Sequence, residues 1–364
     1  MQRRTFLQTG LAMTMTTPLI AALRRERVDE AIASLQHAVD EKQVAAATLY
    51  VEQRGETLAR AFGAAKDEHA MFLLGSISKP IAITSLITLL DEEKLKLEDP
   101  LHKYIPAFSG EGRERVTLQH LLTHVSGLPD QLPNNGDLRK SHAPLSEFVL
   151  RAIKTPLHFA PGTRYMYSSM AILLACRVAE IVGGADILTL VEQRVLRPLK
   201  MEHSSQGLGR FSLDQLVAMQ TERAAPEAGG GDPTAKSWDW NSPYWRKLGA
   251  PWGGTHASAP DVGRFLAEFL DERGAAVKPA TARRMVANHN PAGFVSRGLG
   301  FAVGSSIASP GCSQTTFGHT GSTGTIAWAD PSTRTICVVL TSLPAQAVKP
   351  HPRDLAAARI AAAT

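Results

Sequence analysis

The placement of strand-like and helix-like runs is the feature that most constrains the fold of this chain. Two strand-like runs flank Arg54–Gly55 near the N-terminus, and three more occupy residues 298–304, 323–331 and 333–342. From about residue 115 to 250, helical patterns alternate with loops. This order predicts one sheet built from both ends of the chain, with a helical insertion between them.

The N-terminus has the layout of an export signal. Arg3 and Arg4 precede an apolar stretch of modest length, from about Thr9 to Leu23. Paired arginines before such a stretch are typical of a twin-arginine signal. We therefore expect residues 1–25 to direct export to the periplasm or the exterior. No other run in the sequence is long and apolar enough to span a bilayer.

The composition is that of a globular protein and argues against a nucleic-acid partner. The chain has 364 residues and a formal charge of +5, and its basic residues form no stripe. Its three cysteines are too few, and odd in number, for a disulfide framework. Cys176 and Cys337 lie in apolar runs, which favours packing roles, whereas Cys312 lies in a loop.

The stretch GSISKP, residues 75–80, places a hydroxyl and an amine three residues apart. On a helix, Ser76 and Lys79 would lie on one face, one turn apart. A serine hydroxyl is a good nucleophile only when a base takes its proton. A lysine can be that base where burial or nearby positive charge lowers its pKa. The pattern alone is weak, because a serine before a helix is commonly only an N-cap.

Two further stretches could complete such a site. In PGTRYMYSS, Tyr167 stands two residues before Ser169, and a tyrosine beside a lysine can act as base or proton relay. In GHTGSTGTIAW, glycines border a strand-like run, which often marks the close approach of a ligand to the backbone. His319 and Thr320 would present hydrogen-bonding groups there. Alone, each stretch also fits a structural role, as a buried aromatic residue or a glycine-rich hairpin edge.

Taken together and in this order, the three motifs Ser76-x-x-Lys79, Tyr167-x-Ser169 and His319-Thr320-Gly321 resemble those of the serine β-lactamase and DD-peptidase superfamily. Flanking stretches such as LEDPLHKYIP and GGTHASAPDVGRFL are similar to class C-type landmarks of that superfamily. The resemblance covers about residues 27–345. It implies an α+β fold, in which an antiparallel sheet is flanked by helices and carries an inserted all-helical subdomain.

The resemblance also implies how the chain is divided. We expect a single β-lactamase-like catalytic domain over residues 26–364. Its α/β part would comprise roughly residues 26–100 and 253–364, and its helical part roughly residues 101–252. The active site would lie between the two parts.

The mechanism that the resemblance implies is acyl transfer through a serine. Ser76 would attack a carbonyl, and Lys79 and Tyr167 would handle the protons. The backbone N–H groups of Ser76 and Ser322 would form the oxyanion hole. Ser169, His319, Thr320 and Gly321 would complete the substrate-binding surface with Ser322. The implied substrate is a small ester, amide or D-amino-acid peptide, and neither a cofactor nor a metal is implied.

Two positions depart from the family pattern. Ser169 stands where Asn is usual, and serine is shorter and cannot offer both an amide donor and a carbonyl acceptor. Contacts to Lys79 would weaken, which puts efficient β-lactam turnover in doubt. His319 stands where class C β-lactamases carry Lys. A histidine at this position resembles DD-peptidases, D-amino-acid peptidases and some esterases. A neutral imidazole attracts a substrate carboxylate less than an ammonium does.

Other interpretations stay open or are disfavoured. His120 and His124 stand four apart but lack the glutamate of a zinc-protease helix, which favours packing or polar satisfaction. Asp99, Asp130 and Asp261 are typical of turn or cap positions. An aromatic cluster could wall the site or form a satellite core: Trp238, Trp240, Tyr244, Trp245 and Trp252. Because of Ser169, a non-catalytic protein that binds cell-wall peptides or penicillin is the alternative function.

Overall fold

The computed structural model describes residues 23–307 and 309–364. The predicted export signal over residues 1–25 therefore lies almost wholly outside the described residues. Within the described ranges, no helix is both long and apolar enough to cross a membrane.

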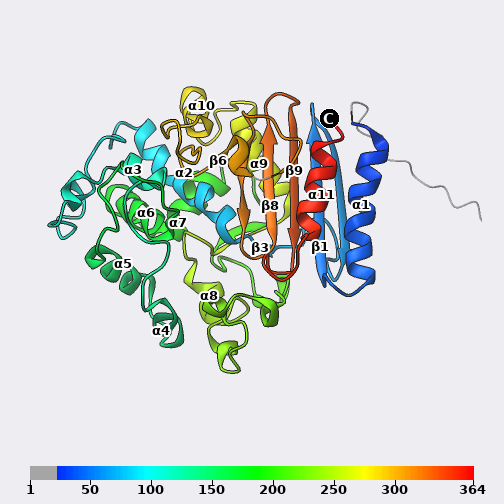
Figure 1. Cartoon of the computed structure of the whole chain (residues 1–364), viewed down its shortest axis with the longest axis horizontal. Coiled ribbons are helices and arrows are strands. Elements are labelled where there is room, and N and C mark those ends of the chain that lie inside the picture. The colour runs from blue at the N-terminus through cyan, green and yellow to red at the C-terminus, as the bar shows by residue number, and fades with distance from the viewer. Residues whose placement is uncertain (1–22, 308) are drawn as a thin grey trace, which may run out of the picture.

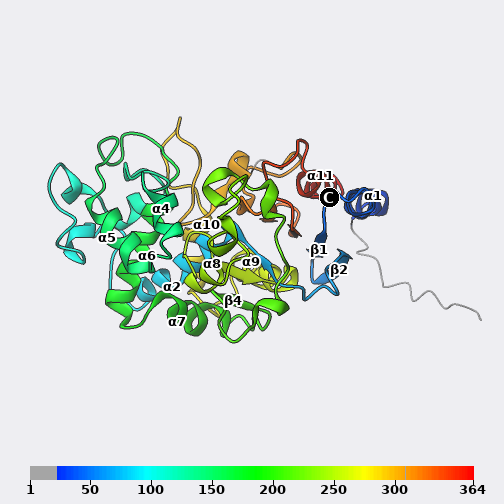
Figure 2. The ribbon, with the colours of Figure 1, turned by 90° about the horizontal axis from the view of Figure 1, so that it is seen from below.

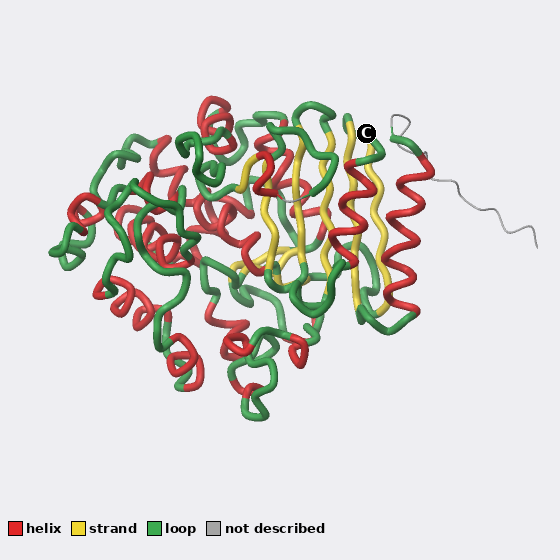
Figure 3. The backbone as a smooth tube through the Cα atoms, in the orientation of Figure 1, coloured by secondary structure: helices red, strands yellow, loops and turns green. Residues whose placement is uncertain are grey.

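The main sheet has six strands, and every neighbouring pair is antiparallel. Its spatial order is β2 (Glu56–Gly63), β1 (Ala46–Gln53), β9 (Thr335–Thr341), β8 (Thr325–Asp330), β7 (Phe317–Gly321) and β6 (Ala302–Val303). The N-terminal hairpin thus joins the C-terminal strands directly through β1 and β9, with Val51 opposite Cys337. Figures 1 and 3 show these strands side by side. The predicted sheet built from both chain ends is confirmed.

Helices cover both faces of this sheet (Figure 2). On one face, α1 (Arg25–Asp40) packs against α11 (Pro352–Ala361), and apolar residues such as Leu35, Trp328 and Ile360 form a core beneath them. Alternate strand residues, such as Tyr50 and Val338, belong to a second and larger core on the other face, together with α9 (Ala259–Leu270). The period-2 alternation of strand side chains produces these two cores.

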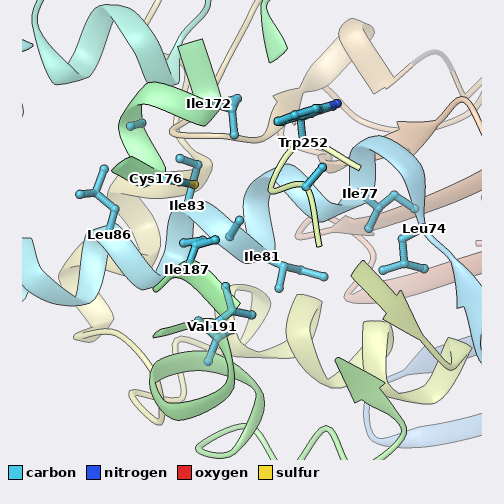
Figure 4. Packing of buried hydrophobic residues seen from close by; sticks show 14 of the residues in the cluster. Leu74, Ile77, Ile81, Ile83, Leu86, Ile172, Cys176, Ile187, Val191 and Trp252 are labelled. Carbon is cyan, nitrogen blue, oxygen red and sulfur yellow. The ribbon is translucent and has the colours of Figure 1, made fainter. Parts of the chain in front are cut away.

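The larger core extends from the sheet into the helical part of the molecule. Its central element is α2 (Ser78–Asp91), in which nearly every residue is buried. Figure 4 shows Ile81, Ile83 and Leu86 of this helix among apolar side chains of neighbouring elements. A helix that is apolar on all sides must be enclosed on all sides. This burial holds the first turn of α2, which carries Lys79, in a fixed position.

The remaining helices include α3 (Leu118–Leu122), α4 (Asn135–Lys140), α5 (Leu145–Lys154), α6 (Ser169–Gly183), α7 (Ile187–Val191), α8 (Pro243–Leu248) and α10 (Pro279–Val286). A small antiparallel sheet has the order β3 (Phe72–Leu73), β5 (Thr255–Ala257), β4 (Ser204–Gln206). Short 3-10 turns include Gly75–Ile77 and Pro226–Ala228.

Local backbone geometry sets where some of these elements end. Helix α3 ends at Leu122, and two residues later His124 adopts a left-handed backbone conformation with φ of 61°, which a helix cannot continue through. The segment over residues 95–106 contains a 3-10 turn at Leu101–Lys103. The strand expected over residues 298–304 shortens to the two residues of β6.

Candidate active site

The turn that carries Ser76 is pressed against the end of strand β7. Gly75 has a φ of 57°, a conformation that favours glycine. A Cβ atom at Gly75 would stand 2.8 Å from Thr323 Oγ1 and 3.2 Å from Ser322 N. Glycine therefore allows the Ser76 turn to approach the backbone after β7, where Ser322 is located.

Hydrogen bonds between backbone groups and side-chain hydroxyls hold this turn between the two sheets. The hydroxyl of Thr325, on β8, donates to the carbonyl oxygen of Leu74 at 2.7 Å. Leu74 N in turn donates to Thr255 O at 2.9 Å, and Thr255 N donates to the buried Ser78 hydroxyl at 3.0 Å. Residues on either side of Ser76 are thus held from separate elements, so the serine hydroxyl has a preorganised position.

Lys79 lies on the same face of the helix start as Ser76. Its Nζ donates to Ser76 Oγ at 2.9 Å and to Trp252 O at 3.0 Å, and the side chain is only 1% exposed. Burial lowers the pKa of Lys79 to about 7. The negative charge of Asp130 opposes this shift, and the positive charge of Arg297 adds to it. A substantial share of the amine is therefore neutral near pH 7 and able to accept a proton.

Tyr167 faces the same two side chains from the segment before α6. Lys79 Nζ stands 4.7 Å from the centre of its ring, and the His124 ring packs against it at 4.6 Å. Burial raises the pKa of Tyr167, while a hydrogen bond with Ser76 and the charge of Arg297 act in the opposite direction. The phenol is therefore protonated at neutral pH and can donate a hydrogen bond to Ser76 Oγ.

Asp130 belongs to this site, although its sequence context suggested only a turn or a cap. One of its carboxylate oxygens, Oδ1, accepts from Ser169 N at 2.9 Å and from Ser169 Oγ at 2.6 Å. Its negative charge also acts on Lys79. No hydrogen bond joins Ser169 to Lys79 among the described residues. The position where Asn is usual in the family therefore contacts Asp130 instead.

A second residue that the sequence did not reveal is Arg297. It is 8% exposed, its Nε donates to Tyr165 Oη at 3.1 Å, and its guanidinium lies 5.4 Å from the centre of the Tyr167 ring. Its Nη1 is 3.5 Å from His319 Nε2. Because a guanidinium can only donate, Nε2 accepts and the ring proton belongs on Nδ1, which donates to Thr320 O at 2.7 Å.

His319 is accordingly a neutral, buried histidine rather than an open cation. Burial, reinforced by the charges of Arg297 and Lys79, holds its pKa well below the usual value. Its ring lies 6.0 Å from that of Tyr167. Thr320 is half-buried beside it on β7, and Gly321 ends that strand.

A cavity of about 210 Å³ opens beside Ser76. Its lining includes Tyr167, Ser169 and Ser322 of the predicted site, Asp130 and Arg139, and the tryptophans Trp240, Trp245 and Trp252. His319 and Thr320 do not line it. The three tryptophans are also buried members of the larger core, so these residues both line the cavity and belong to the core. Trp252 is labelled in Figure 4, near the start of α2.

His120 and His124, which the sequence disfavoured as metal ligands, form hydrogen bonds with backbone groups instead. His120 caps the start of α3 in a reciprocal pair with Thr117. His124 Nδ1 accepts a hydrogen bond from Ser168 N at 3.2 Å. In both cases the imidazole accepts a hydrogen bond from a backbone N–H group, which is the polar role that the sequence favoured. His124 thereby connects the end of α3 to the segment that carries Tyr167.

The geometry unites a hydroxyl, a partly neutral amine and a phenol beside a cavity. Lys79 can take the Ser76 proton, and Tyr167 can donate to a developing alkoxide or relay a proton. The Ser76 turn also approaches the backbone at Ser322, so main-chain N–H groups lie near the reacting oxygen. Such an arrangement suits nucleophilic attack on a carbonyl.

Known proteins with similar sequences include an esterase and a putative carboxypeptidase. Esterase EstB of Burkholderia gladioli is 30% identical over 206 residues, a match that covers 50% of this chain and 52% of EstB. A putative D-alanyl-D-alanine carboxypeptidase of Escherichia coli K12 is 26% identical over 375 residues, covering 91% of this chain and 86% of the relative.

Solved structures share the fold, and a family model matches most of the chain. The D-amino acid amidase from Ochrobactrum anthropi SV3 superposes with a TM-score of 0.73 at 18% identity, over 93% of this chain and 99% of the amidase. The model described as Beta-lactamase matches residues 30–362. The chain therefore belongs to the beta-lactamase family and is a serine hydrolase of that family.

Proposed function

We propose that this protein hydrolyses an ester, an amide or a D-amino-acid peptide through an acyl-enzyme on Ser76. The observation that carries the proposal is the 2.9 Å contact between Lys79 Nζ and Ser76 Oγ, at a lysine whose pKa is lowered to about 7. A cationic lysine of ordinary pKa could not serve as the base at neutral pH. The named relatives supply the substrate range, since they include an esterase and a putative carboxypeptidase.

In the acylation step, Ser76 Oγ forms a bond to the carbonyl carbon and its proton passes to Lys79 Nζ. The backbone N–H groups of Ser76 and Ser322 would hold the oxyanion. The carbon–oxygen or carbon–nitrogen bond of the substrate then breaks, and the leaving group takes a proton that Tyr167 relays from Lys79. In deacylation, water gives a proton to the same pair and attacks the acyl carbon. Ser76 Oγ leaves and regains a proton.

The substrate surface in this proposal combines the cavity beside Ser76 with the β7 edge. Ser169 and Ser322 line the cavity, whereas His319, Thr320 and Gly321 define the edge of β7. Because Ser169 is tied to Asp130, it offers a substrate amide less than the usual Asn would. We therefore expect slow or absent β-lactam turnover, with ester or peptide hydrolysis as the main activity.

Residues 26–364 would act as one catalytic domain after removal of an export signal over residues 1–25. In this division residues 26–100 and 253–364 form the α/β part and residues 101–252 the helical part. The protein would be exported to the periplasm or the exterior by a twin-arginine signal. Putative carboxypeptidases among the relatives fit that destination.

A substrate panel tests the proposed activity. Purified protein is assayed with p-nitrophenyl butyrate, nitrocefin and a D-Ala-D-Ala peptide, beside Lys79→Ala and a matched control, Lys94→Ala, at an exposed lysine. We expect turnover of the ester or the peptide, a loss of about a hundredfold or more in Lys79→Ala, and wild-type rates in Lys94→Ala. If nothing is turned over and a cell-wall peptide binds Ser76→Ala as tightly as wild type, the non-catalytic alternative holds instead.

A further inference from the structure

The cavity beside Ser76 contains a buried cation that the acyl-transfer chemistry does not use. Arg139 lies on the short helix α4 and is only 4% exposed, yet it lines the same cavity as Ser76. The charged residues along this lining are Asp130, Arg139 and Glu227. The aromatic wall around them is formed by Trp240, Trp245 and Trp252.

Arg139 has few partners for a buried guanidinium. Its Nη1 donates to the carbonyl oxygen of Glu227 at 2.7 Å, and the group stacks over the Trp245 ring at 3.8 Å. Its Nε is buried without a hydrogen-bond partner. Within the described part of the chain, no carboxylate forms an ion pair with it. One backbone carbonyl therefore accounts for one of the five N–H donors that arginine carries.

The two acidic residues that line the cavity with Arg139 do not neutralise it. Asp130 uses Oδ1 to hold Ser169 and exerts its charge on Lys79. The Glu227 side chain is exposed and makes no ion pair with Arg139 among the described residues, although its charge raises the arginine's pKa. Burial lowers the pKa of Arg139 to about 10 against the opposing effects of Tyr244 and Glu227, so the group stays cationic at neutral pH.

An unpaired buried cation is costly unless an anion completes it. A guanidinium fork matches a carboxylate in two parallel hydrogen bonds. We propose that Arg139 binds a carboxylate of the substrate, so that the preferred esters, amides or peptides carry an anionic group on a short arm. This inference rests on the proposed function, because it assigns the substrate class of the Ser76 site.

The rest of the cavity fits such an arm. The indole walls would hold its apolar methylene groups, while the volume of about 210 Å³ limits its length. A neutral ester of the same length would fill the same space but leave the guanidinium unpaired. The anionic substrate should therefore bind more tightly than its neutral counterpart, by the binding free energy of one charge-assisted contact.

The test compares matched pairs of substrates. Mono-p-nitrophenyl glutarate and p-nitrophenyl pentanoate differ by a carboxylate on the acyl arm, and 4-acetoxybenzoate and phenyl acetate differ by one on the leaving group. We expect wild type to prefer the anionic member of at least one pair by about tenfold in kcat/KM. In Arg139→Met this ratio should fall about tenfold, and Arg139→Lys should retain part of it. A preference in the first pair places the bound carboxylate on the acyl arm of the substrate, and a preference in the second pair places it on the leaving group.

Arg164→Met is the matched control, because Arg164 is exposed and also lies over an aromatic ring, that of Phe159. Its ratios should equal those of wild type. A purely structural Arg139 would make both members of each pair fall by the same factor, leaving the ratios unchanged, and that result overturns the proposal. So does a wild-type ratio near one for both pairs.

A binding measurement separates this proposal from the hydrolase proposal. Calorimetric titration of Ser76→Ala with glutarate should show binding that Arg139→Lys weakens and that the double variant with Arg139→Met abolishes. Absence of glutarate binding to a folded Ser76→Ala protein overturns the carboxylate site even if esters are hydrolysed. Glutarate binding without turnover of any substrate supports the carboxylate site and rejects the hydrolase instead.

Discussion

Lys79 Nζ lies 2.9 Å from Ser76 Oγ, and the lysine side chain is almost wholly buried at the start of α2. A lysine in water has a pKa of 10.5, but burial lowers the pKa of Lys79 to about 7. The pair therefore changes from an ammonium beside an alcohol to an amine beside an alcohol within the physiological pH range. Its reactivity and its stability should both follow that change.

The pH dependence of acylation should report the titration of Lys79. Only the neutral amine can accept the serine proton, so kcat/KM should rise with pH from about 6 to 8 and level off above the pKa near 7. The measurement is kcat/KM for p-nitrophenyl butyrate, corrected for spontaneous hydrolysis. A flat profile over this range would mean that another group is the base.

Burial of Lys79 should reduce the stability of the fold. Its native pKa of about 7 lies below the value of 10.5 for a free lysine, so between these limits the unfolded chain binds more protons. Stability from this group therefore rises with pH across that window, and the cost of burial is greatest below pH 7. Lys79→Met should raise the free energy of unfolding by about 0.5 to 2 kcal/mol at pH 7 while abolishing activity.

Urea unfolding at pH 6, 8 and 9.5 checks this expectation. The gain in Lys79→Met over wild type should shrink as the pH rises. Lys94→Met, at an exposed lysine, should differ from wild type by no more than about 0.5 kcal/mol at each pH. A Lys79→Met protein less stable than wild type at every pH would contradict the account.

Removing the charge of Asp130 should shift the pH profile toward acid. The Asp130 carboxylate raises the pKa of Lys79 against the effect of burial, so Asp130→Asn should lower the midpoint of the kcat/KM profile. The asparagine oxygen can still accept the Ser169 hydrogen bonds that Oδ1 now receives. Asp137→Asn, at an exposed acid on α4, should leave the midpoint in place. An unchanged midpoint in Asp130→Asn would remove Asp130 from the electrostatics of the site.

Removing the charge of Arg297 should shift the same profile in the opposite direction. Arg297 lowers the pKa of Lys79, so Arg297→Gln should move the midpoint to higher pH. The same change removes a charge that holds the pKa of His319 down, so this histidine should become easier to protonate. Histidine resonances followed by NMR would detect that second effect. Midpoint shifts of the same sign in Asp130→Asn and Arg297→Gln would contradict the charge assignment.

The sequence was sufficient to predict the parts of the site that depend on local geometry. Ser76 and Lys79 meet because an i, i+3 spacing at a helix start places two side chains on one face. The sheet built from both chain ends also followed from the order of strand-like runs. The motif resemblance then led us to expect Tyr167 and strand β7 beside Ser76 and Lys79.

The contacts that adjust the chemistry could not be predicted in the same way. Asp130 reaches Ser169 across 39 residues, and its local context resembles an ordinary turn. Arg297 approaches His319 from a loop with no sequence signature. Arg139 gave no signal either, because a single arginine on a short helix is usually solvated. Each of these contacts depends on tertiary packing, which places charges that a linear pattern does not relate.

The most direct test of the central claim is the site of covalent modification. The protein is incubated with a fluorophosphonate probe, digested, and analysed by mass spectrometry beside Ser76→Ala and the control Ser109→Ala, at an exposed serine. We expect the label on Ser76 in wild type and Ser109→Ala, and no label in Ser76→Ala. Equal labelling of wild type and Ser76→Ala, or a label on another serine, would contradict the assignment of Ser76 as the nucleophile.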